Sequence, residues 1–315
     1  MRHAPLFLSL IFVLLLNASE LLERTQVMMG TFATISLPQE KTKELQKSFE
    51  ILRAVEASLS SYDANADIYK LNHDRVATLS SYSYEALLFS QRYYEKSNGY
   101  FDITVGSVTK GLYRFGEDER LADSGALKNA RIGFQGLHFD TEQARLDEGT
   151  VIDLGGMGKG FGVDKAAAYL REQNVTRGTI ALSGDIRCLD ICKMGIQDPF
   201  GEGTLAEFTT KHPGTAVSTS GNYRRYVESR AHNHLIDPKK KRSQQEFASI
   251  TLISLGKNSD IDAYATAASV MPVEEAIRFL KTLDVAYLLV TASGERHRSD
   301  NLERYVSHFT YLKQQ

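Results

Sequence analysis

The sequence predicts an α+β fold in which mixed or antiparallel sheets are flanked by helices. Two kinds of apolar periodicity occur along the chain: steps of two, typical of half-buried strands, and steps of three and four, typical of amphipathic helices. These segments do not follow the strict strand–helix–strand rhythm that would indicate a parallel sheet. The chain has 315 residues, of which 42% are hydrophobic and 24% are charged. This length and composition fit a single compact domain with an ordinary core.

The first elements are a strand and a helix. Residues 26–37 are predicted to form a strand because Ala33, Ile35 and Leu37 alternate with less apolar neighbours. A helix is predicted next from an apolar stripe at helical spacing, namely Leu45, Phe49, Leu52, Val55 and Leu59. The polar residues at 60–67 then indicate a loop.

The middle and the end of the chain contain further elements of both kinds. A second helix is predicted at 84–97, where the Asn-Gly pair at 98–99 provides a C-terminal stop. Residues 151–154 indicate a short strand that leads into the glycine-rich loop at 155–160, and residues 163–171 indicate a helix after it. Further strands are expected near 178–183, 214–218, 247–255 and 285–291, and further helices near 260–271 and 273–283.

The N-terminus has the order of a secretory signal. Arg2 precedes an apolar run at 6–16, and the small residues at 18–19 suit a cleavage site. The run is too short to span a bilayer, which takes roughly 20 residues. We therefore predict a signal peptide at 1–19, a mature domain at 20–315, and export to the periplasm. The alternative is an uncleaved segment that associates the protein with the inner membrane.

Charge and cysteine content narrow the function classes. The formal net charge is −2, which gives no indication of the basic face that a nucleic-acid partner requires. The two cysteines, Cys188 and Cys192, are spaced one residue further apart than the C-x-x-C motif of thiol-redox proteins. No second cysteine or histidine cluster accompanies them at metal-ligand spacing. Two interpretations of this cysteine pair remain open: two ordinary small residues, or a disulfide formed outside the cytoplasm.

The glycine-rich segment at 151–164 suits the binding of a phosphate but fails both common templates. A P-loop would need glycine where Asp153 stands and serine or threonine where Gly160 stands, and the dinucleotide fingerprint would need glycine in place of Phe161. The glycines still allow backbone N–H groups to approach a phosphate, a helix N-terminus adds partial positive charge, and Lys159 adds a full one. The alternative is a tight strand-to-helix turn without a ligand.

Two further segments carry candidate chemistry. Asp262 and Thr266 are four residues apart, so on a helix they share one face and could offer oxygen ligands to Mg²⁺. The alternative is an aspartate that merely favours a helix start. His234, close to the Asp-Pro turn at 237–238, could be a general acid or base, although such a histidine is more often structural. The basic residues at 239–242 are interpreted as a solvated turn.

Together these segments make the chain resemble the ApbE family, the FAD:protein FMN transferases, along nearly all of the mature length. Several unrelated short motifs in the family's order make the combined pattern specific. The matching pieces are Met29-Gly30-Thr31, Ser61-Tyr62-Asp63, Gly99-Tyr100-Phe101-Asp102 with Val105-Gly106, Asp153-Leu154-Gly155-Gly156-x-x-Lys159-Gly160, Ser218-Thr219-Ser220-Gly221, His234-Leu235-Ile236-Asp237-Pro238, and Asp262-x-x-x-Thr266. The resemblance implies one ApbE-like domain.

The resemblance also implies roles for single residues. Positions matching those that line the FAD site of the family are Met29, Tyr62, Tyr100, Phe101, Asp102, Asp153, Lys159 and Ile236. The backbone carbonyl of Gly156 and the side chains of Asp262 and Thr266 match the metal positions. Two residues are candidates for the group that accepts the proton of the attacking hydroxyl, His234 and Asp262.

The implied reaction is the Mg²⁺-dependent transfer of the FMN moiety of FAD to a threonine hydroxyl of a target flavoprotein, with release of AMP. The implied acceptors are flavoprotein subunits of membrane electron-transfer complexes. One alternative is a pyrophosphatase that splits FAD into FMN and AMP with water as the acceptor. Another is a non-catalytic exported FAD-binding protein, against which Asp262 and Thr266 argue because a carrier needs no metal.

Overall fold

The structure, a computed structural model, describes residues 20–312. The predicted signal peptide at 1–19 lies outside the described residues, and the predicted domain boundary stays a prediction. Within the described part of the chain, no helix is both long enough and apolar enough to cross a membrane.

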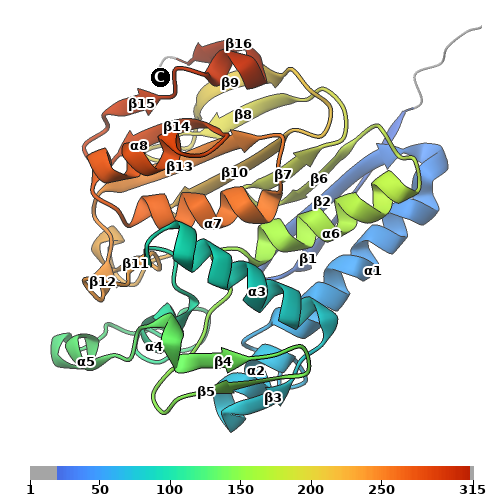
Figure 1. Ribbon diagram of the computed structural model, residues 1–315. Helices are drawn as coiled ribbons and strands as arrows, with labels where there is room; N and C mark the ends of the chain where they lie inside the picture. The colour runs from blue at the N-terminus through green and yellow to red at the C-terminus, as the bar shows by residue number, and fades with distance from the viewer. Residues whose placement is uncertain (1–19, 313–315) are drawn as a thin grey trace, which may run out of the picture.

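A sheet of eight strands forms the centre of the fold (Figure 1). In spatial order its strands are β1 (Leu21–Met28), β2 (Thr31–Pro38), β6 (Thr179–Leu182), β7 (Asp185–Cys188), β10 (Ala216–Gly221), β13 (Phe247–Ser254), β14 (Ala286–Thr291) and β15 (Arg296–Arg298). Each neighbouring pair runs antiparallel. With helices packed against this sheet, the predicted α+β class is confirmed.

The first predicted strand is a hairpin, so the single strand expected at 26–37 is wrong. The chain reverses at Met29 and Gly30, whose φ angles of 51° and 69° lie in the left-handed region. Glycine adopts this region without steric cost, which makes it a natural turn residue. The backbone N–H of Met29 donates a 2.6 Å hydrogen bond to Oε1 of Glu56, which fixes the turn against the following helix.

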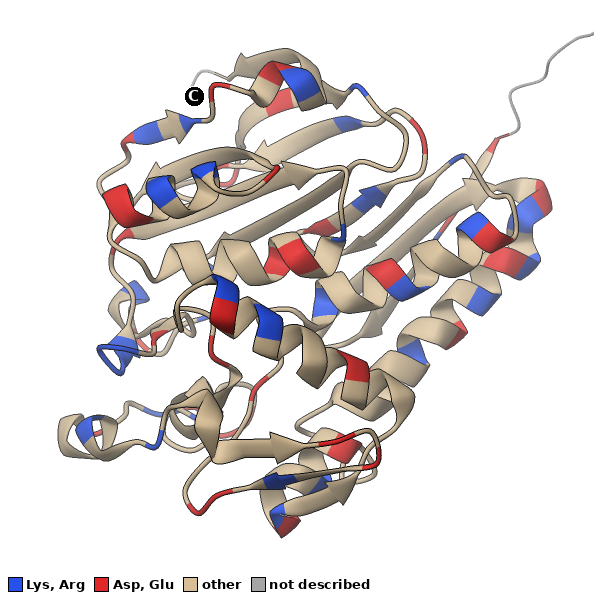
Figure 2. Cartoon of the chain, viewed as in Figure 1, with Lys and Arg blue, Asp and Glu red and all other residues tan. Residues whose placement is uncertain are grey.

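The predicted helices lie on one face of the sheet, as Figure 1 shows. They are α1 (Thr42–Leu59), α3 (Ser81–Lys96), α6 (Gly158–Glu172), α7 (Asn258–Ser269) and α8 (Val273–Lys281). The predicted apolar stripe of α1 is buried along its whole length. In Figure 2, Lys, Arg, Asp and Glu alternate along the outward side of α1 and α6, which is the charged face expected opposite such a stripe.

The crossing of α6 and α7 depends on a glycine and an aspartate. A Cβ atom on Gly160 would lie 2.5 Å from the carbonyl oxygen of Asn258, so only glycine allows the two backbones to come this close. The carboxylate of Asp164 accepts hydrogen bonds from the backbone N–H groups of Asn258 (2.8 Å) and Ser259 (2.9 Å), and thereby caps α7 from the neighbouring helix. These contacts place the first turn of α6 beside α7.

The opposite face of the large sheet is covered by a smaller sheet. Its three strands, in the order β16-β9-β8, are Val306–Tyr311, Thr204–Thr210 and Lys193–Gln197. A second apolar core fills the space between the two sheets and includes Met194, Ile196 and Phe208 from the small sheet and Val217 and Leu288 from the large one.

The remaining elements are short. They are η1 (Gln39–Lys41), α2 (Asp67–Asp74), β3 (Val76–Thr78), η2 (Ile103–Val105), α4 (Gly106–Thr109), α5 (Ser124–Asn129), η3 (Phe134–Gly136), β4 (Leu137–Phe139), β5 (Gln143–Leu146), η4 (Arg230–His232), β11 (Ile236–Asp237), β12 (Arg242–Ser243) and α9 (Leu302–Tyr305). β3, β5 and β4 form a second three-stranded sheet, and β11 pairs with β12.

Residues 151–154 do not form the predicted strand. The backbone N–H and C=O of Ile152 are both bonded to the side-chain amide of Asn72, at 2.8 and 2.9 Å, and the N–H of Asp153 donates to the carbonyl of Ile103 at 2.7 Å. The backbone groups that a neighbouring strand would satisfy are therefore taken by a side chain and a turn. The segment is extended but irregular, and α6 begins at Gly158, earlier than the predicted start at 163.

Cys188 and Cys192 form a disulfide. Of the two readings that the sequence left open, the structure selects the bridge. It links the end of β7 in the large sheet to the residue that precedes β8 in the small sheet. The disulfide thus fixes the two sheets to each other at this point.

Candidate active site

A cavity of about 1,210 Å³ opens where the large sheet, the glycine-rich loop and the segments before α2 and β11 meet. Every residue that the sequence analysis selected for a site lines this cavity: Met29, Tyr62, Tyr100, Phe101, Asp102, Asp153, Gly156, Lys159, His234, Ile236, Asp262 and Thr266. These residues come from segments far apart in the chain, so the fold brings them together. Their individual roles remain predictions.

The glycine-rich loop turns tightly from Asp153 into α6. The backbone N–H groups of Met157 and Gly158 both donate to the carbonyl of Leu154, at 3.1 and 2.8 Å. A Cβ atom on Gly156 would lie 3.0 Å from Cγ2 of Thr266 and 3.3 Å from the ring of Phe101. The absence of a side chain at Gly156 therefore leaves its carbonyl close to α7.

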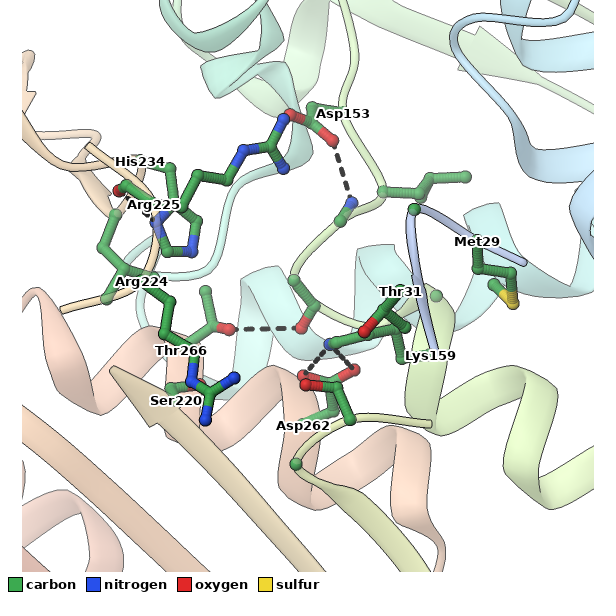
Figure 3. Close-up of a pocket in the computed structure, with 18 of the residues that line it drawn as sticks. Met29, Thr31, Asp153, Lys159, Ser220, Arg224, Arg225, His234, Asp262 and Thr266 are labelled. Atoms are coloured by element: carbon green, nitrogen blue, oxygen red, sulfur yellow. Dashed lines mark hydrogen bonds and ion pairs between the residues drawn. The ribbon is translucent and has the colours of Figure 1, made fainter. Parts of the chain in front are cut away.

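Hard oxygen atoms converge beside this loop. The hydroxyl of Thr266 donates to the carbonyl of Gly156 at 3.3 Å, and Asp262 lies one turn earlier on α7 with only 3% of its surface exposed (Figure 3). A carboxylate, a carbonyl and a hydroxyl form the kind of donor set that Mg²⁺ accepts, with water and phosphate oxygens completing the shell. Among the described residues there is no cluster of three or more His, Cys, Asp or Glu side chains that could hold a metal by themselves.

Lys159 lies between two buried carboxylates. Its Nζ is 2.9 Å from Oδ2 of Asp185 and 3.4 Å from Oδ2 of Asp262. The hydroxyl of Ser218 donates to the other oxygen of Asp185 at 2.6 Å, and the backbone N–H of Gly160 donates to Asp262 at 3.1 Å. One ammonium group and two carboxylates leave a net negative charge, which favours a divalent cation at this position.

These neighbours shift the titration of both partners. Burial tends to lower the pKa of the Lys159 ammonium, but the charges of Asp185 and Asp262 outweigh burial and raise it. Burial, followed by the charge of Asp185, raises the pKa of the Asp262 carboxyl. Sequence analysis missed Asp185, because an aspartate at the start of a short strand carries no signal that it will meet a lysine from a distant helix.

A second polar cluster lies around Tyr62. The phenol donates to the carbonyl of Phe115 at 2.7 Å and accepts hydrogen bonds from Lys110 and, at 3.0 Å, from Arg225. The ammonium of Lys110 also lies 3.8 Å from the centre of the Tyr62 ring and 3.8 Å from Oδ2 of Asp153. These contacts hold a ring that is largely exposed at the cavity, and they surround it with positive charge.

Asp153 belongs to the same cluster. Its Oδ2 accepts a hydrogen bond from the Thr109 hydroxyl at 2.7 Å, and its Oδ1 accepts one from the backbone N–H of Gly155 at 2.9 Å. Burial tends to raise the pKa of the Asp153 carboxyl, but the Lys110 charge and these hydrogen bonds lower it below its ordinary value. Asp153 is therefore a fixed anion that shapes the loop.

The aromatic wall of the cavity is tied to its surroundings. The hydroxyl of Tyr100 donates to Oε2 of Glu275 at 2.8 Å, and the ammonium of Lys239 lies 3.5 Å from the centre of the Tyr100 ring. The carboxylate of Asp102 is buried and accepts hydrogen bonds from the backbone N–H (2.8 Å) and hydroxyl (2.6 Å) of Thr104. Its observed contacts therefore stabilise the start of η2.

The basic turn between β11 and β12 is exposed at Lys239, Lys240 and Arg242, as the sequence predicted, and its lysines also make specific contacts. Lys239 contacts Tyr100 as described, and Lys240 forms an ion pair with Asp237 at 3.2 Å. Lys241 donates to the backbone carbonyls of Lys128 (3.1 Å) and Ala130 (2.9 Å). The turn, blue beside β12 in Figure 2, thereby ties the cavity wall to the segment after α5.

His234 reaches the cavity from the residues before β11. Its Nδ1 lies 3.1 Å from the carbonyl of Arg225, so Nδ1–H donates to that carbonyl and Nε2 carries the free lone pair (Figure 3). Burial, followed by the positive charge of Arg225, lowers the pKa of His234 to about 4. The imidazole is therefore neutral at neutral pH and its Nε2 is free to accept a hydrogen bond from a hydroxyl group, while the lowered pKa makes it a weak base.

These features define the class of protein. A glycine-rich loop at a helix start, a half-buried lysine and convergent oxygen donors line one cavity on an antiparallel α+β fold, which are the features that binding of a phosphate-containing ligand together with a hard metal ion would require. The sequence profile described as the ApbE family matches residues 29–289. The chain belongs to the ApbE family, as the motifs indicated.

Known proteins agree with this placement. The chain is 24% identical over 301 residues to an FAD:protein FMN transferase of Klebsiella pneumoniae, which covers 88% of this chain and 93% of that protein. It is 27% identical over 281 residues to the protein of the same name in Haemophilus influenzae, covering 82% of this chain and 80% of that protein.

Solved structures share the fold. The ApbE protein of Thermotoga maritima superposes with a TM-score of 0.83 at 21% identity, over 92% of this chain and all of that one (100%). The flavin transferase ApbE of Vibrio cholerae gives a TM-score of 0.79 at 20% identity, over 91% of this chain and 99% of that one. The predicted single ApbE-like domain is confirmed.

The environment of His234 leads to a testable prediction on pH. We expect its ring to titrate with a midpoint of about 4, against roughly 6.5 for an unperturbed histidine, in NMR spectra assigned with a His234→Asn variant. The folded state then binds this proton less tightly than the unfolded state does. The contribution of neutral His234 to the free energy of unfolding is therefore complete above pH 6.5 and decreases as the pH falls towards 4. A midpoint near 6.5 would contradict the buried, neutral imidazole.

Proposed function

We propose that this protein transfers the FMN moiety of FAD to a threonine hydroxyl of a target flavoprotein, with release of AMP, in a Mg²⁺-dependent reaction. The observation that carries the proposal is the convergence of the glycine-rich loop, Lys159 and the oxygen donors of Gly156, Asp262 and Thr266 in one cavity with aromatic walls. Membership of the ApbE family, and relatives named FAD:protein FMN transferase, support it.

The reaction has a balanced form. The threonine oxygen forms a bond to the FMN-side phosphorus of FAD, the bond from that phosphorus to the bridging oxygen breaks, and AMP leaves with the bridging oxygen. The hydroxyl proton passes to a base, for which Nε2 of neutral His234 and the carboxylate of Asp262 are the two candidates. Phosphoryl transfer of this kind needs positioning and charge neutralisation more than covalent catalysis.

The residues divide this work between them. Gly156, Asp262 and Thr266 would hold Mg²⁺, which when bound supplies charge neutralisation at the pyrophosphate. Lys159, fixed between Asp185 and Asp262, presents a positive charge at the start of α6, where the helix N-terminus adds to it. The half-exposed ring of Tyr62 would offer a flat surface for the flavin or the adenine on the face that Lys110 does not cover, and Tyr100 contributes to the wall of the cavity.

The deciding experiment is incubation of the purified protein with FAD, Mg²⁺ and FMN-binding domains of membrane flavoprotein subunits, followed by the intact mass of each domain. The proposal expects a mass gain equal to one phosphoester-linked FMN and an equal amount of AMP. Release of FMN and AMP without a mass gain would identify a pyrophosphatase instead. Binding of FAD without any cleavage would identify a carrier.

We expect Asp262→Ala to abolish transfer while FAD binding partly survives. Asp262 supplies the full negative charge of the proposed metal set, so its loss weakens Mg²⁺ most, whereas aromatic contacts with the flavin do not need the cation. Thr266→Ala removes a neutral donor that water replaces, so a smaller loss is expected. The measurement is a Mg²⁺ titration of AMP release.

Asp260→Asn serves as the control for this pair, because it removes a carboxylate from the same helix. The side chain of Asp260 accepts a hydrogen bond from Tyr93 and does not line the cavity. It should keep the wild-type dependence on Mg²⁺. If folded Asp262→Ala also keeps the wild-type rate and metal dependence, the metal assignment is wrong.

We expect Asp185 to affect the affinity for the metal through Lys159, without being a metal ligand itself. In Asp185→Asn, Lys159 loses its closer partner and pairs fully with Asp262, so the carboxylate becomes less available to a cation. We expect the dissociation constant for Mn²⁺, followed by electron paramagnetic resonance as a substitute for Mg²⁺, to rise about tenfold or more. Ser218→Ala keeps the charges of Lys159 and Asp185 and should change the dissociation constant for Mn²⁺ much less. Equal affinity in Asp185→Asn and wild type would show that Lys159 does not compete with the metal.

We also propose that the protein works outside the cytoplasm, at the membrane where acceptor subunits of electron-transfer complexes are found. The disulfide between Cys188 and Cys192 supports this location, because such bonds persist mainly in oxidising compartments. N-terminal sequencing of protein from the native cell is expected to start near Ser19 or Glu20. A soluble cytoplasmic protein that begins at Met1 would contradict the proposal.

A further inference from the structure

The last strand of the small sheet forms a wall of the cavity that no predicted site residue occupies. β8 ends the order β16-β9-β8, so no described strand pairs with its outer edge. Four consecutive residues of β8, at 194–197, line the cavity. Gly195 has no side chain, so its place in the lining means that the backbone of β8 itself faces the cavity.

The direction of the backbone groups follows from the register. The N–H of Thr210 donates to the carbonyl of Cys192 at 2.9 Å, which makes these two a hydrogen-bonded pair next to the Lys193–Thr209 pair. In an antiparallel ladder bonded and non-bonded pairs alternate. Lys193 and Gly195 are therefore in non-bonded pairs, and their N–H and C=O groups point away from β9 towards the open edge.

This edge is held firmly in place. The side chains of Met194 and Ile196 are buried in the core between the sheets, and the disulfide fixes Cys192, immediately before the strand, to the end of β7. Natural proteins usually shield such an edge, because unpaired N–H and C=O groups bind any extended chain that comes near. Here the edge stays open on the side of the cavity.

The surroundings suit a polypeptide. Phe32 also lines the cavity, is 66% exposed, and forms a cross-strand pair with Val27, which is 74% exposed. The cavity volume of about 1,210 Å³ exceeds the roughly 300–1,000 Å³ of usual small-molecule pockets, so a second substrate has room beside the first. The residues predicted to bind FAD lie on the other walls, which leaves the wall formed by β8 for that second substrate.

We propose that β8 is the docking strand for the acceptor: an extended segment of the target polypeptide adds to its open edge and carries the threonine hydroxyl into the cavity. The inference rests on the proposed function, which requires a polypeptide acceptor. Main-chain hydrogen bonds to Lys193 and Gly195 supply the affinity, as in other cases of strand addition. Alternate side chains of the added strand, the threonine among them, face the cavity.

The test uses a matched pair of substitutions at Gly195. Gly195→Pro removes the N–H that points to the open edge; this N–H is not used in the ladder with β9, so the small sheet keeps its hydrogen bonds. Gly195→Ala keeps the N–H, and its methyl group meets Cγ2 of Thr204 at an ordinary 3.4 Å. The acceptors are a pool of 11-residue peptides with a central threonine and randomised flanks, and, in parallel, the folded flavoprotein domains.

We expect Gly195→Pro to raise KM for the modified peptides about tenfold, with the affinity for FAD and the melting temperature unchanged, while Gly195→Ala behaves like wild type. In the wild-type protein, hydrogen exchange at Lys193 and Gly195 should slow when a selected peptide, with valine in place of its threonine, is added. This second measurement does not depend on how the proline variant folds.

The outcomes separate the inference from the proposed function. An unchanged KM in Gly195→Pro, or unprotected amides in β8, overturns strand docking. If folded domains are labelled but no peptide in the pool is, the transferase activity stands and strand docking is overturned. Strand docking requires an extended segment alone to be recognised. If the wild-type protein labels no acceptor, both the proposed transferase function and strand docking are overturned.

Discussion

The ion-paired triplet of Lys159, Asp185 and Asp262 is the interaction on which the rest of the site depends. It joins the start of α6, the start of β7 and the first half of α7. Charges this deeply buried are tolerated only when they are paired and hydrogen-bonded, which Ser218 and the N–H of Gly160 provide. This arrangement, together with the close approach of Gly160 to Asn258 and the cap from Asp164, positions the glycine-rich loop over α7.

The sequence was sufficient where local pattern and global fold agree. The stripe of α1 and the Asp262–Thr266 spacing on α7 are periodic signals, and the structure confirms both elements. The sequence failed where a single residue reverses or replaces a pattern. Gly30 turns one apparent strand into a hairpin, and the side chain of Asn72 takes the place of a strand partner for Ile152.

The location of the site could be predicted from the sequence more fully than the contacts within it. The motifs identified residues on every wall but that of β8, yet they did not indicate what those residues contact. Lys110 and Arg225 reach the cavity, and Asp185 reaches Lys159, from segments that the sequence analysis did not select, and their effects are long-range charges that no local window contains. The neutral state of His234 is likewise a product of burial and of Arg225, and neither can be read from the residues around it in sequence.

The triplet also bears on how the protein matures. Lys159 already balances part of the charge of Asp262, so this carboxylate does not wait for a metal before it can be buried. The chain can reach its native structure first and acquire its cation afterwards, unlike small metal-dependent domains that stay unfolded until the ion arrives. Under the proposed function, chelation should then be reversible, and the folded chain would persist as an inactive reserve until Mg²⁺ and FAD are both at hand.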